Sequence, residues 1–561
     1  MDNFHDIPYK RPDIKKLKEA IKQCIKDVKN AKSAEDLIAA LEKNENATKE
    51  METYYVIASI RNTMDTTDEF YDGEMQYFNR TVPALMPISK KMTDTLLASP
   101  YIGAIEEKYG VQVINLLKAA AAIQSKKLVP SLIKEGLIST QYSKTVASCT
   151  TDFNGEQCNF YGLLRHMGST DREVRKSAFI AWADMYKSIS DKLDKQYDSL
   201  VALRHKMAKK LGYDTYTPLA YLQRSRFDYT AQDVAAFREQ VRTVITPLVA
   251  KMRQKQAERI GVDKLHYYDE EFMFPDGNAM PIGDKDSMLA AAEEMYSQLS
   301  AETGEFFSFM TKHNLFDLET RPGKHMGGYC TFLSLYKAPF IFSNFNGTSA
   351  DVDVLTHEAG HAFEAYTASR IQPISDYYSS TSEINEIHSM AMELFTHPWM
   401  DKFFGENADK YRFAHLSGCI SVIPYLTCVD EFQHGVYADP NMTAKERRTL
   451  WRSIEQKYMP WRDYDGNEFL DEGGFWMQKQ HIFLYPFYYI DYALAQLGAL
   501  ELYNRMQKDR DEAWESYLEL CRAGGSKPYL ELLKLAKLSN PFKEGTVASI
   551  LAPLEDILLS R

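Results

Sequence analysis

The pentapeptide His357-Glu358-Ala359-Gly360-His361 has the pattern H-E-x-x-H and constrains this chain more than any other segment. Residues four positions apart lie on one face of an α-helix, so His357 and His361 can share a metal ion if this segment is helical. Glu358 then turns toward a water molecule beside that ion. The segment predicts a helix that carries two ligands and the general base of a zinc hydrolase; a helix with two His residues by chance is the alternative.

The residues between the two histidines are small, which bears on how the helix packs. Gly inside a helix costs about 1 kcal/mol relative to Ala. Gly360 therefore indicates that another element lies close to this turn. Close packing at this position is expected of a buried site.

A catalytic zinc site needs a third protein ligand and an open position for water. The metzincin continuation H-x-x-G-x-x-H is excluded, because Glu364 and Thr367 stand where its Gly and His belong. The remaining candidates share an acidic side chain downstream of the motif. They are Glu364, Asp376, Glu383, Glu386 and Glu393.

Three of these acidic residues lie in the segment 381–395, whose apolar residues recur at helical spacing. Glu386 and Glu393 are two turns apart on the other face, so one could bind the metal while the other orients a ligand His. A solvated acidic face is the alternative for both residues. Ser380 and Glu383 form a capping-box pattern, which predicts that Glu383 caps the start of this helix.

The segments H-E-A-G-H-A-F and E-I-H-S-M-A-M-E, the second beginning at Glu386, together resemble the thimet oligopeptidase and oligoendopeptidase F family of zinc metallopeptidases. The resemblance implies one zinc ion held by His357, His361 and Glu386. It also implies that Glu358 is the general base and that Glu393 is the second acidic residue of the pattern, in the outer shell of the site.

The resemblance extends upstream of the motif. Gly327, Gly328 and Tyr329 resemble the family's glycine-containing loop, and the segment that begins at Ala338 resembles the strand bordering its cleft. These residues are expected to bind substrate. The strand from 338 to 345 is expected to hold an extended peptide by backbone hydrogen bonds, as edge strands commonly do.

Downstream of the motif, His481 and the tyrosines Tyr488, Tyr489 and Tyr492 resemble the His and Tyr cluster of the same family. The surrounding run suggests the Pz-peptidase-like members of the oligoendopeptidase F branch. Aromatic hydroxyls or an imidazole are donors of the kind that a tetrahedral oxyanion requires. We therefore expect Tyr492 and His481 to act on the transition state.

Helical periodicity dominates the chain, and only residues 326 to 346 read as strands of a small sheet. The fold class expected is mainly α. The resemblance implies a two-lobed helical zinc peptidase with a deep substrate cleft and a small β-sheet beside the active-site helix. We predict an N-terminal helical domain over residues 1–195 and a catalytic domain over residues 196–561.

Composition restricts partners and compartment. The net charge of −12 argues against a nucleic-acid or anionic-membrane partner. No signal peptide is evident, and no apolar run approaches the roughly 20 residues of a membrane span. The seven cysteines are scattered and lack C-x-x-C spacing, which is typical of free thiols in a reducing compartment. We expect a cytoplasmic protein; the oligomeric state is left open.

These observations predict a zinc-dependent oligoendopeptidase that hydrolyses internal bonds of short peptides with a metal-activated water and a Glu general base. One alternative is another zinc hydrolase such as an aminopeptidase. The second alternative is a noncatalytic helical peptide-binding protein. The intact Glu358 argues against the latter, because a metal site kept only for structure has no use for a base.

Overall fold

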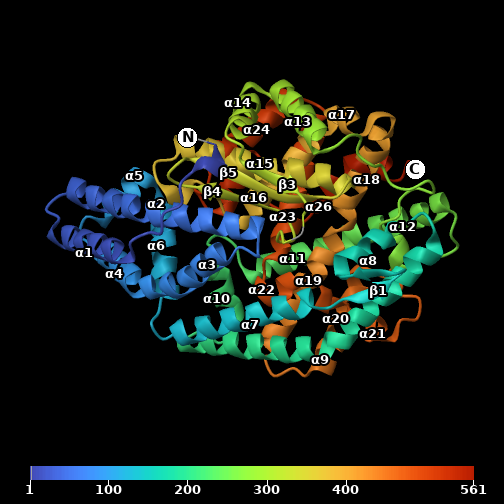
Figure 1. The fold of residues 1–561 in the computed structure, drawn as a ribbon, viewed down its shortest axis with the longest axis horizontal. Coiled ribbons are helices and arrows are strands. Elements are labelled where there is room, and N and C mark those ends of the chain that lie inside the picture. The colour runs from blue at the N-terminus through green and yellow to red at the C-terminus, as the bar shows by residue number, and fades with distance from the viewer. Residues whose placement is uncertain (2, 322) are drawn as a thin grey trace.

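The computed structural model describes residue 1 and residues 3–321 and 323–561. Helices form most of it, and the strands make two small sheets (Figure 1). Apolar stripes at helical spacing explain the helices: in α1 (Ile14–Asn30), the buried Leu17, Ile21, Ile25 and Val28 recur every three or four residues. The mainly α fold predicted from periodicity is confirmed.

The N-terminal helices occupy the blue end of the molecule at the left of Figure 1. They are α1, α2 (Ala34–Met64), α3 (Glu69–Thr81), α4 (Met86–Leu97), α5 (Ile102–Tyr109) and α6 (Val111–Ile123); α7 (Val129–Ala147) follows them at the lower middle of the view, beside the next long helix. Several of them share a small hydrophobic cluster that also includes Ile374 and Tyr377 from the segment after the H-E-x-x-H helix. The N-terminal helices are thus anchored to the part of the chain that carries the motif.

The middle of the chain is built around one long helix, α9 (Arg172–Lys210), along the lower edge of Figure 1. Its neighbours in sequence are β1 (Thr151–Phe153), β2 (Glu156–Cys158), α8 (Phe160–Met167), α10 (Tyr216–Gln223), α11 (Ala231–Gln240), α12 (Thr246–Ile260), α13 (Lys285–Leu299) and α14 (Ala301–Lys312). Residue 195, where we placed the domain boundary, lies within the continuous α9. That boundary stays a prediction.

The second sheet has three strands in the order β3 (Phe316–Glu319), β5 (Ala338–Phe345), β4 (Tyr329–Leu333). β4 and β5 fall where strands were expected, whereas β3 was not anticipated. β5 is paired in parallel with β3 and antiparallel with β4, so it is the middle strand. The prediction that β5 offers an edge to a peptide is therefore wrong; β4 lies at the edge.

The H-E-x-x-H motif lies in the centre of α15 (Ser349–Ile371), and the acidic segment forms α16 (Ser382–Phe395). α15 packs on β5 and on α16 (Figure 1). A Cβ atom on Gly360 would lie 2.6 Å from both the carbonyl oxygen of His388 and the Cα of Ser389. The close approach predicted from Gly360 is the contact between the two ligand-bearing helices.

Gly360→Ala should destabilise the protein, because the added methyl group collides with the backbone of α16. Overpacking of this kind costs about 1–3 kcal/mol or more. We expect a lower melting temperature and weaker zinc binding, since the two helices must separate. Gly103→Ala is a matched control, because a Cβ there meets no atom within 4 Å. Equal melting temperatures for the two variants would contradict the close contact.

The C-terminal third supplies the helices that surround α15 and α16. They are α17 (Asp401–Phe404), α18 (Ala408–Ser421), α19 (Ile423–Ala438), α20 (Ala444–Tyr458), α21 (Glu468–Asp471), α22 (Gln480–Leu484), α23 (Tyr489–Met506), α24 (Arg510–Ala523), α25 (Tyr529–Leu535), α26 (Thr546–Leu551) and α27 (Glu555–Leu558). α23 packs along α16, which brings the predicted His and Tyr cluster to the acidic helix.

One stretch of the described chain, Asp401–Ala438, is long and apolar enough to cross a membrane by length and composition. It comprises α17, α18 and α19, and 72% of its apolar window is buried inside the fold. Our sequence analysis did not anticipate this stretch. Burial in the core of a large protein accounts for its apolar character.

Candidate active site

His357, His361 and Glu386 come together between α15 and α16. The Nε2 atoms of His357 and His361 lie 3.3 and 3.6 Å from Oε2 of Glu386. Both histidine side chains are about one-fifth exposed, whereas Glu386 is buried. The three ligand atoms therefore converge on one point that solvent can reach.

The donor set fits zinc. Tetrahedral zinc binds imidazole nitrogen and carboxylate oxygen at about 2.0–2.2 Å, which places neighbouring ligand atoms a little over 3 Å apart. The observed separations match this spacing. Two neutral imidazoles and one carboxylate also leave a fourth position for water, as a catalytic site requires.

Glu358 lies beside this group on α15 and is buried. Burial raises the pKa of the Glu358 carboxyl, while the neighbouring imidazoles of His357 and His361 oppose the rise. A carboxylate with a raised pKa is a better proton acceptor than an ordinary one. Its position next to both histidines suits the role of general base.

Glu393 approaches His357 from the side opposite Glu386. Nδ1 of His357 lies 2.6 Å from Oε1 of Glu393, so the imidazole that presents Nε2 to a metal donates its other proton to this carboxylate. The second oxygen of Glu393 lies 2.7 Å from Nε2 of His415 in α18. Nδ1 of His415 is in turn 2.9 Å from Nε2 of His397. The position of Glu393 agrees with the predicted outer-shell role.

Glu393→Gln should weaken zinc binding by about 10–100-fold, because it removes the negative charge that holds His357 in its metal-binding orientation. Competition against a chelator of known affinity measures the change. Glu293→Gln, on the exposed face of α13, is a matched control. Unchanged zinc affinity in the Glu393 variant would show that this carboxylate does not support the site.

Glu383 does not cap α16, so that prediction is wrong. The helix begins after Thr381, and Glu383 is buried. Its carboxylate accepts a hydrogen bond from the Tyr229 hydroxyl and lies 3.7 Å from Nε of Arg226. The capping pattern failed because a buried arginine and tyrosine from a distant segment compete for the same carboxylate.

The three predicted tyrosines lie near the three ligands and differ in their hydrogen bonds and packing. The hydroxyl of Tyr488 donates a hydrogen bond of 2.6 Å to Oε1 of Glu386. The ring of Tyr492 lies 5.1 Å from that of Tyr488, and burial raises the pKa of its hydroxyl. Tyr489 is nearly buried and packs against Tyr425, with no hydrogen bond to the ligand group. The Tyr492 hydroxyl also interacts with that of Tyr488, so Tyr488 is the partner of both Glu386 and Tyr492.

His481 in α22 lies among these tyrosines, with its ring stacked 5.8 Å from that of Tyr488. Burial and the nearby Lys479 ammonium lower the pKa of His481 to about 4. The imidazole is therefore neutral near pH 7. It can act as a neutral hydrogen-bond donor.

Nothing in the sequence indicated Arg224, a cation that contacts the ring of Tyr488. The Arg224 guanidinium lies over the ring of Tyr488 at 4.5 Å and donates a 2.9 Å hydrogen bond to Asp491. Asp491 also pairs with the buried Arg226. These residues come from segments more than two hundred positions apart. No local spacing relates them, and only the run that contains Asp491 was noted in advance.

The four residues predicted to bind substrate differ in exposure and in their distance from the site. Gly327 and Gly328 are exposed, and a Cβ on Gly328 would lie 3.7 Å from Oε1 of Glu358. The hydroxyl of Tyr329 is occupied by Thr63 of α2 at 2.6 Å. Ala338 is fully buried, so its side chain cannot contact a substrate. The glycine pair thus borders the site, and the substrate-binding role of Ala338 stays a prediction.

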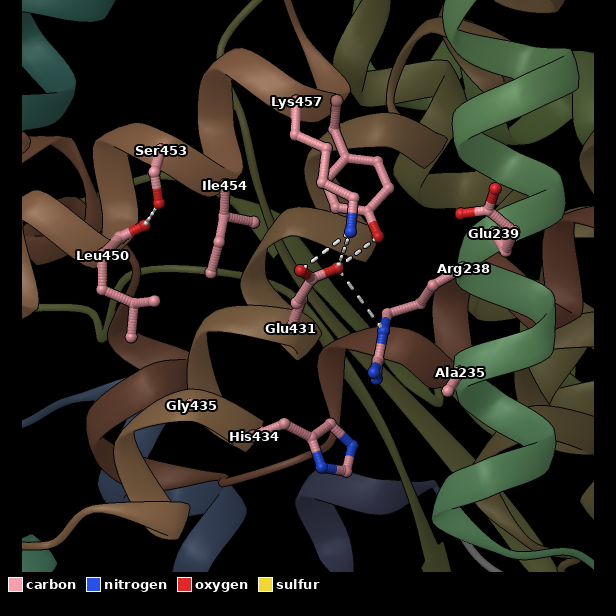
Figure 2. A pocket seen from close by; sticks show the side chains of 11 residues that line it. Ala235, Arg238, Glu239, Glu431, His434, Gly435, Leu450, Ser453, Ile454 and Lys457 are labelled. Carbon is pink, nitrogen blue, oxygen red and sulfur yellow. Dashed lines mark hydrogen bonds and ion pairs between the residues drawn. The ribbon is translucent and has the colours of Figure 1, made fainter.

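A separate surface pocket of about 460 Å³ lies where α11, α19 and α20 meet, and Figure 2 shows its lining. Glu431 accepts hydrogen bonds from Lys457 and Tyr458 and lies 3.7 Å from Arg238 (Figure 2). Glu431 thus pairs with the two cations of the lining, whereas Glu239 pairs with Arg242 outside it. None of the predicted site residues lines this pocket.

Comparison with known proteins bears on this site. Residues 4–123 match the model of the Peptidase M3 N-terminal domain, and residues 165–277 and 294–550 match that of Peptidase family M3. The chain belongs to peptidase family M3. The second match includes α15, α16 and the segment with the His and Tyr cluster.

Individual relatives agree with this membership. The solved structure "PZ PEPTIDASE A with inhibitor 2" is 45% identical, with a TM-score of 0.95 over 100% of this chain and 99% of that chain. Oligopeptidase PepF of Bacillus subtilis (strain 168) is 23% identical over 92% of this chain and 80% of its own length. An oligoendopeptidase F homolog of Lactococcus lactis subsp. lactis is 23% identical over 90% of this chain and 86% of its own. The predicted resemblance is confirmed.

Proposed function

We propose that this family M3 metalloendopeptidase hydrolyses internal bonds of short peptides at one zinc ion bound by His357, His361 and Glu386. The convergence of these three ligand atoms beside Glu358 carries the proposal. Family membership makes the chain an oligopeptidase and implies zinc. The residue assignments rest on the geometry of the site.

His357, His361 and Glu386 would hold the zinc ion, which when bound would supply a Lewis acid for the scissile carbonyl and for a water molecule. Glu358 accepts a proton from the attacking water and later delivers it to the leaving amine. Glu393 keeps the Nδ1 proton on His357 and so fixes the ring orientation. Tyr488 and Ser389 donate to the two oxygens of Glu386, which fixes the third ligand.

Tyr492 and His481 are proposed to donate hydrogen bonds to the oxyanion that forms on the carbonyl oxygen. Both side chains are partly exposed and lie next to the ligand group on the side of α23. Donors aimed at developing charge act mainly in the transition state. Their neutrality at pH 7 suits donation without a strong attraction for the substrate's own carboxylates.

Tyr492→Phe removes one hydroxyl and changes the volume little. Turnover should fall by roughly a hundredfold or more, while zinc content and the Michaelis constant change little. Steady-state kinetics on a quenched-fluorescence peptide measures both constants. Tyr489→Phe is the matched control and should be near wild type. An increase in the Michaelis constant alone would make Tyr492 a substrate-positioning residue.

The peptide is proposed to bind beside β4, with Gly327 and Gly328 admitting its backbone close to Glu358. The sheet edge supplies backbone donors and acceptors to an extended chain. Gly328 has no side chain, so the space next to the Glu358 carboxylate stays open for the peptide. A deep cleft that admits short peptides and excludes folded proteins remains part of this proposal.

A peptide blocked at both ends tests the proposal against its alternative. We expect an N-acetylated, C-amidated oligopeptide to be cut internally, and a chelator to abolish the cleavage. An aminopeptidase requires a free terminal amine and would leave the blocked peptide intact. Binding of the peptide without cleavage by zinc-loaded protein would favour the noncatalytic alternative.

We further propose that the protein works in the cytoplasm and without a nucleic-acid or membrane partner. All seven cysteines are free thiols, which supports a reducing compartment. The net charge of −12 opposes binding to polyanions. Localisation of the tagged full-length chain by cell fractionation tests the first point.

A further inference from the structure

A second group of metal-ligating side chains lies outside the catalytic centre. Among the described residues, the ligand atoms of Glu156, Cys158 and His166 lie within 4.8 Å of one another. Glu156 and Cys158 belong to β2, and His166 lies near the end of α8. The three side chains provide oxygen, sulfur and nitrogen, a donor set that suits zinc and other thiophilic divalent cations.

Local structure holds this group in place. β1 and β2 form a hairpin whose turn residues Asn154 and Gly155 both have positive φ, as a tight two-residue hairpin turn requires. The side chain of Asn159 caps α8 by accepting from the backbone N–H of Gly162. The hairpin and the helix are thus joined directly after Cys158.

The Cys158 sulfur and a ring nitrogen of His166 lie within 4.8 Å of each other. A Cβ on Gly162 would lie 3.4 Å from the Cys158 sulfur, so a glycine leaves the room that the thiol occupies. Cys158 is 4% exposed and forms no disulfide. The ring of His166 packs against Phe153 with the centroids 4.9 Å apart.

The strongest sign of a ligand is on His166. Its Nε2 atom is buried and has no hydrogen-bond partner. It lies 3.9 Å from Oε2 of Glu156, too far for a hydrogen bond and close to the separation of two ligands of one ion. A buried imidazole nitrogen without a partner costs free energy that a bound cation would recover.

We propose that Glu156, Cys158 and His166 bind a second divalent cation of the zinc class, independently of the His357, His361 and Glu386 site. Binding requires loss of the thiol proton from Cys158 and a contraction of up to roughly 1.5 Å between ligand atoms. Arg165 competes for this site, because it donates a 2.9 Å hydrogen bond to Oε2 of Glu156. Glu156 is mostly exposed, so its side chain can turn and water can fill the fourth position.

Asn159, the residue after Cys158, contacts the glycine-containing loop that precedes β4. Nδ2 of Asn159, which follows Cys158, lies 3.8 Å from the sulfur of Met326. Met326 directly precedes Gly327. A cation here would fix the end of the hairpin that touches this loop, yet it contributes no atom to the centre at His357.

Cobalt titration of the chelator-stripped full-length chain distinguishes the two sites. The ligands His357, His361 and Glu386 contain no sulfur, whereas a Cys158 thiolate bound to cobalt gives a thiolate-to-metal charge-transfer band. We expect two cobalt ions per chain and this band. In Cys158→Ser, the band and one ion should be lost, while zinc-dependent peptide cleavage persists.

Further variants make the result decisive. His166→Gln should weaken cobalt binding at this site by more than about tenfold. This variant tests the same site if the Cys158 variant fails to fold. Cys149→Ser, a half-buried cysteine outside the group, is the matched control and should retain the band. Absence of the band in the wild-type chain would overturn the proposal. Its persistence in Cys158→Ser would do the same and would assign it to another thiol such as Cys330, near Glu358.

Discussion

Replacing Glu358 by Gln should leave zinc bound and reduce peptide hydrolysis by about three orders of magnitude or more. The amide has nearly the shape of the carboxylate but cannot accept a proton from water. Glu358 is not one of the three converging ligands, so the metal affinity should stay close to that of the wild type. Zinc content by mass spectrometry and turnover of a blocked peptide give both results.

Glu364→Gln is the matched control for this variant. Glu364 lies on the same helix and is buried, and burial raises the pKa of its carboxyl well above the usual range. Turnover in the control should stay near the wild-type level. Near-wild-type turnover in zinc-loaded Glu358→Gln would contradict the assignment of the base.

Glu386→Ala should weaken zinc binding by more than about a hundredfold, beyond the effect of removing an outer-shell partner. It also leaves the Tyr488 hydroxyl and the two histidines without their shared acceptor. Calorimetric titration with zinc measures the affinity. Activity should fall in parallel and recover partly at high zinc concentration.

Glu383→Ala is the contrasting variant three residues away. It removes the partner of the buried Arg226 and Tyr229, so it should lower the melting temperature by several degrees. The folded fraction should still bind zinc with the wild-type affinity. Equal loss of zinc affinity in the two variants would show that the third ligand was assigned wrongly.

Local spacing in the sequence was sufficient to predict that two candidate metal ligands lie together. His357 and His361 are four residues apart, and helical geometry alone places them together. Glu386 lies on a separate helix, and residue spacing left Glu386 and Glu393 as open alternatives. The family resemblance chose between them, and the structure places Glu386 with the histidines and Glu393 behind His357.

The errors arose where tertiary contacts override local patterns. Glu383 fits a capping box by sequence, but Arg226 and Tyr229 from another segment bind its carboxylate. β5 was taken for an edge strand because the short β3 has no strong alternating pattern and was not recognised. Pairing partners of a strand are not encoded in the strand itself.

The supporting residues were the least predictable part of the site. His415 and Arg224 reach Glu393 and Tyr488 from helices or loops that are remote in sequence. An isolated His or Arg in a helical pattern is more often a surface or core residue than a site residue. Only packing in three dimensions reveals these contacts.

The central claim is that one zinc ion at His357, His361 and Glu386 is required for internal cleavage of peptides. Titrating zinc into chelator-stripped protein, while following cleavage of a doubly blocked oligopeptide, tests it most directly. We expect no cleavage without metal and a rise that saturates when one zinc ion per chain occupies the His357, His361 and Glu386 site, with products cut at internal bonds. Cleavage by the metal-free protein, or saturated zinc binding without any cleavage, would contradict the account.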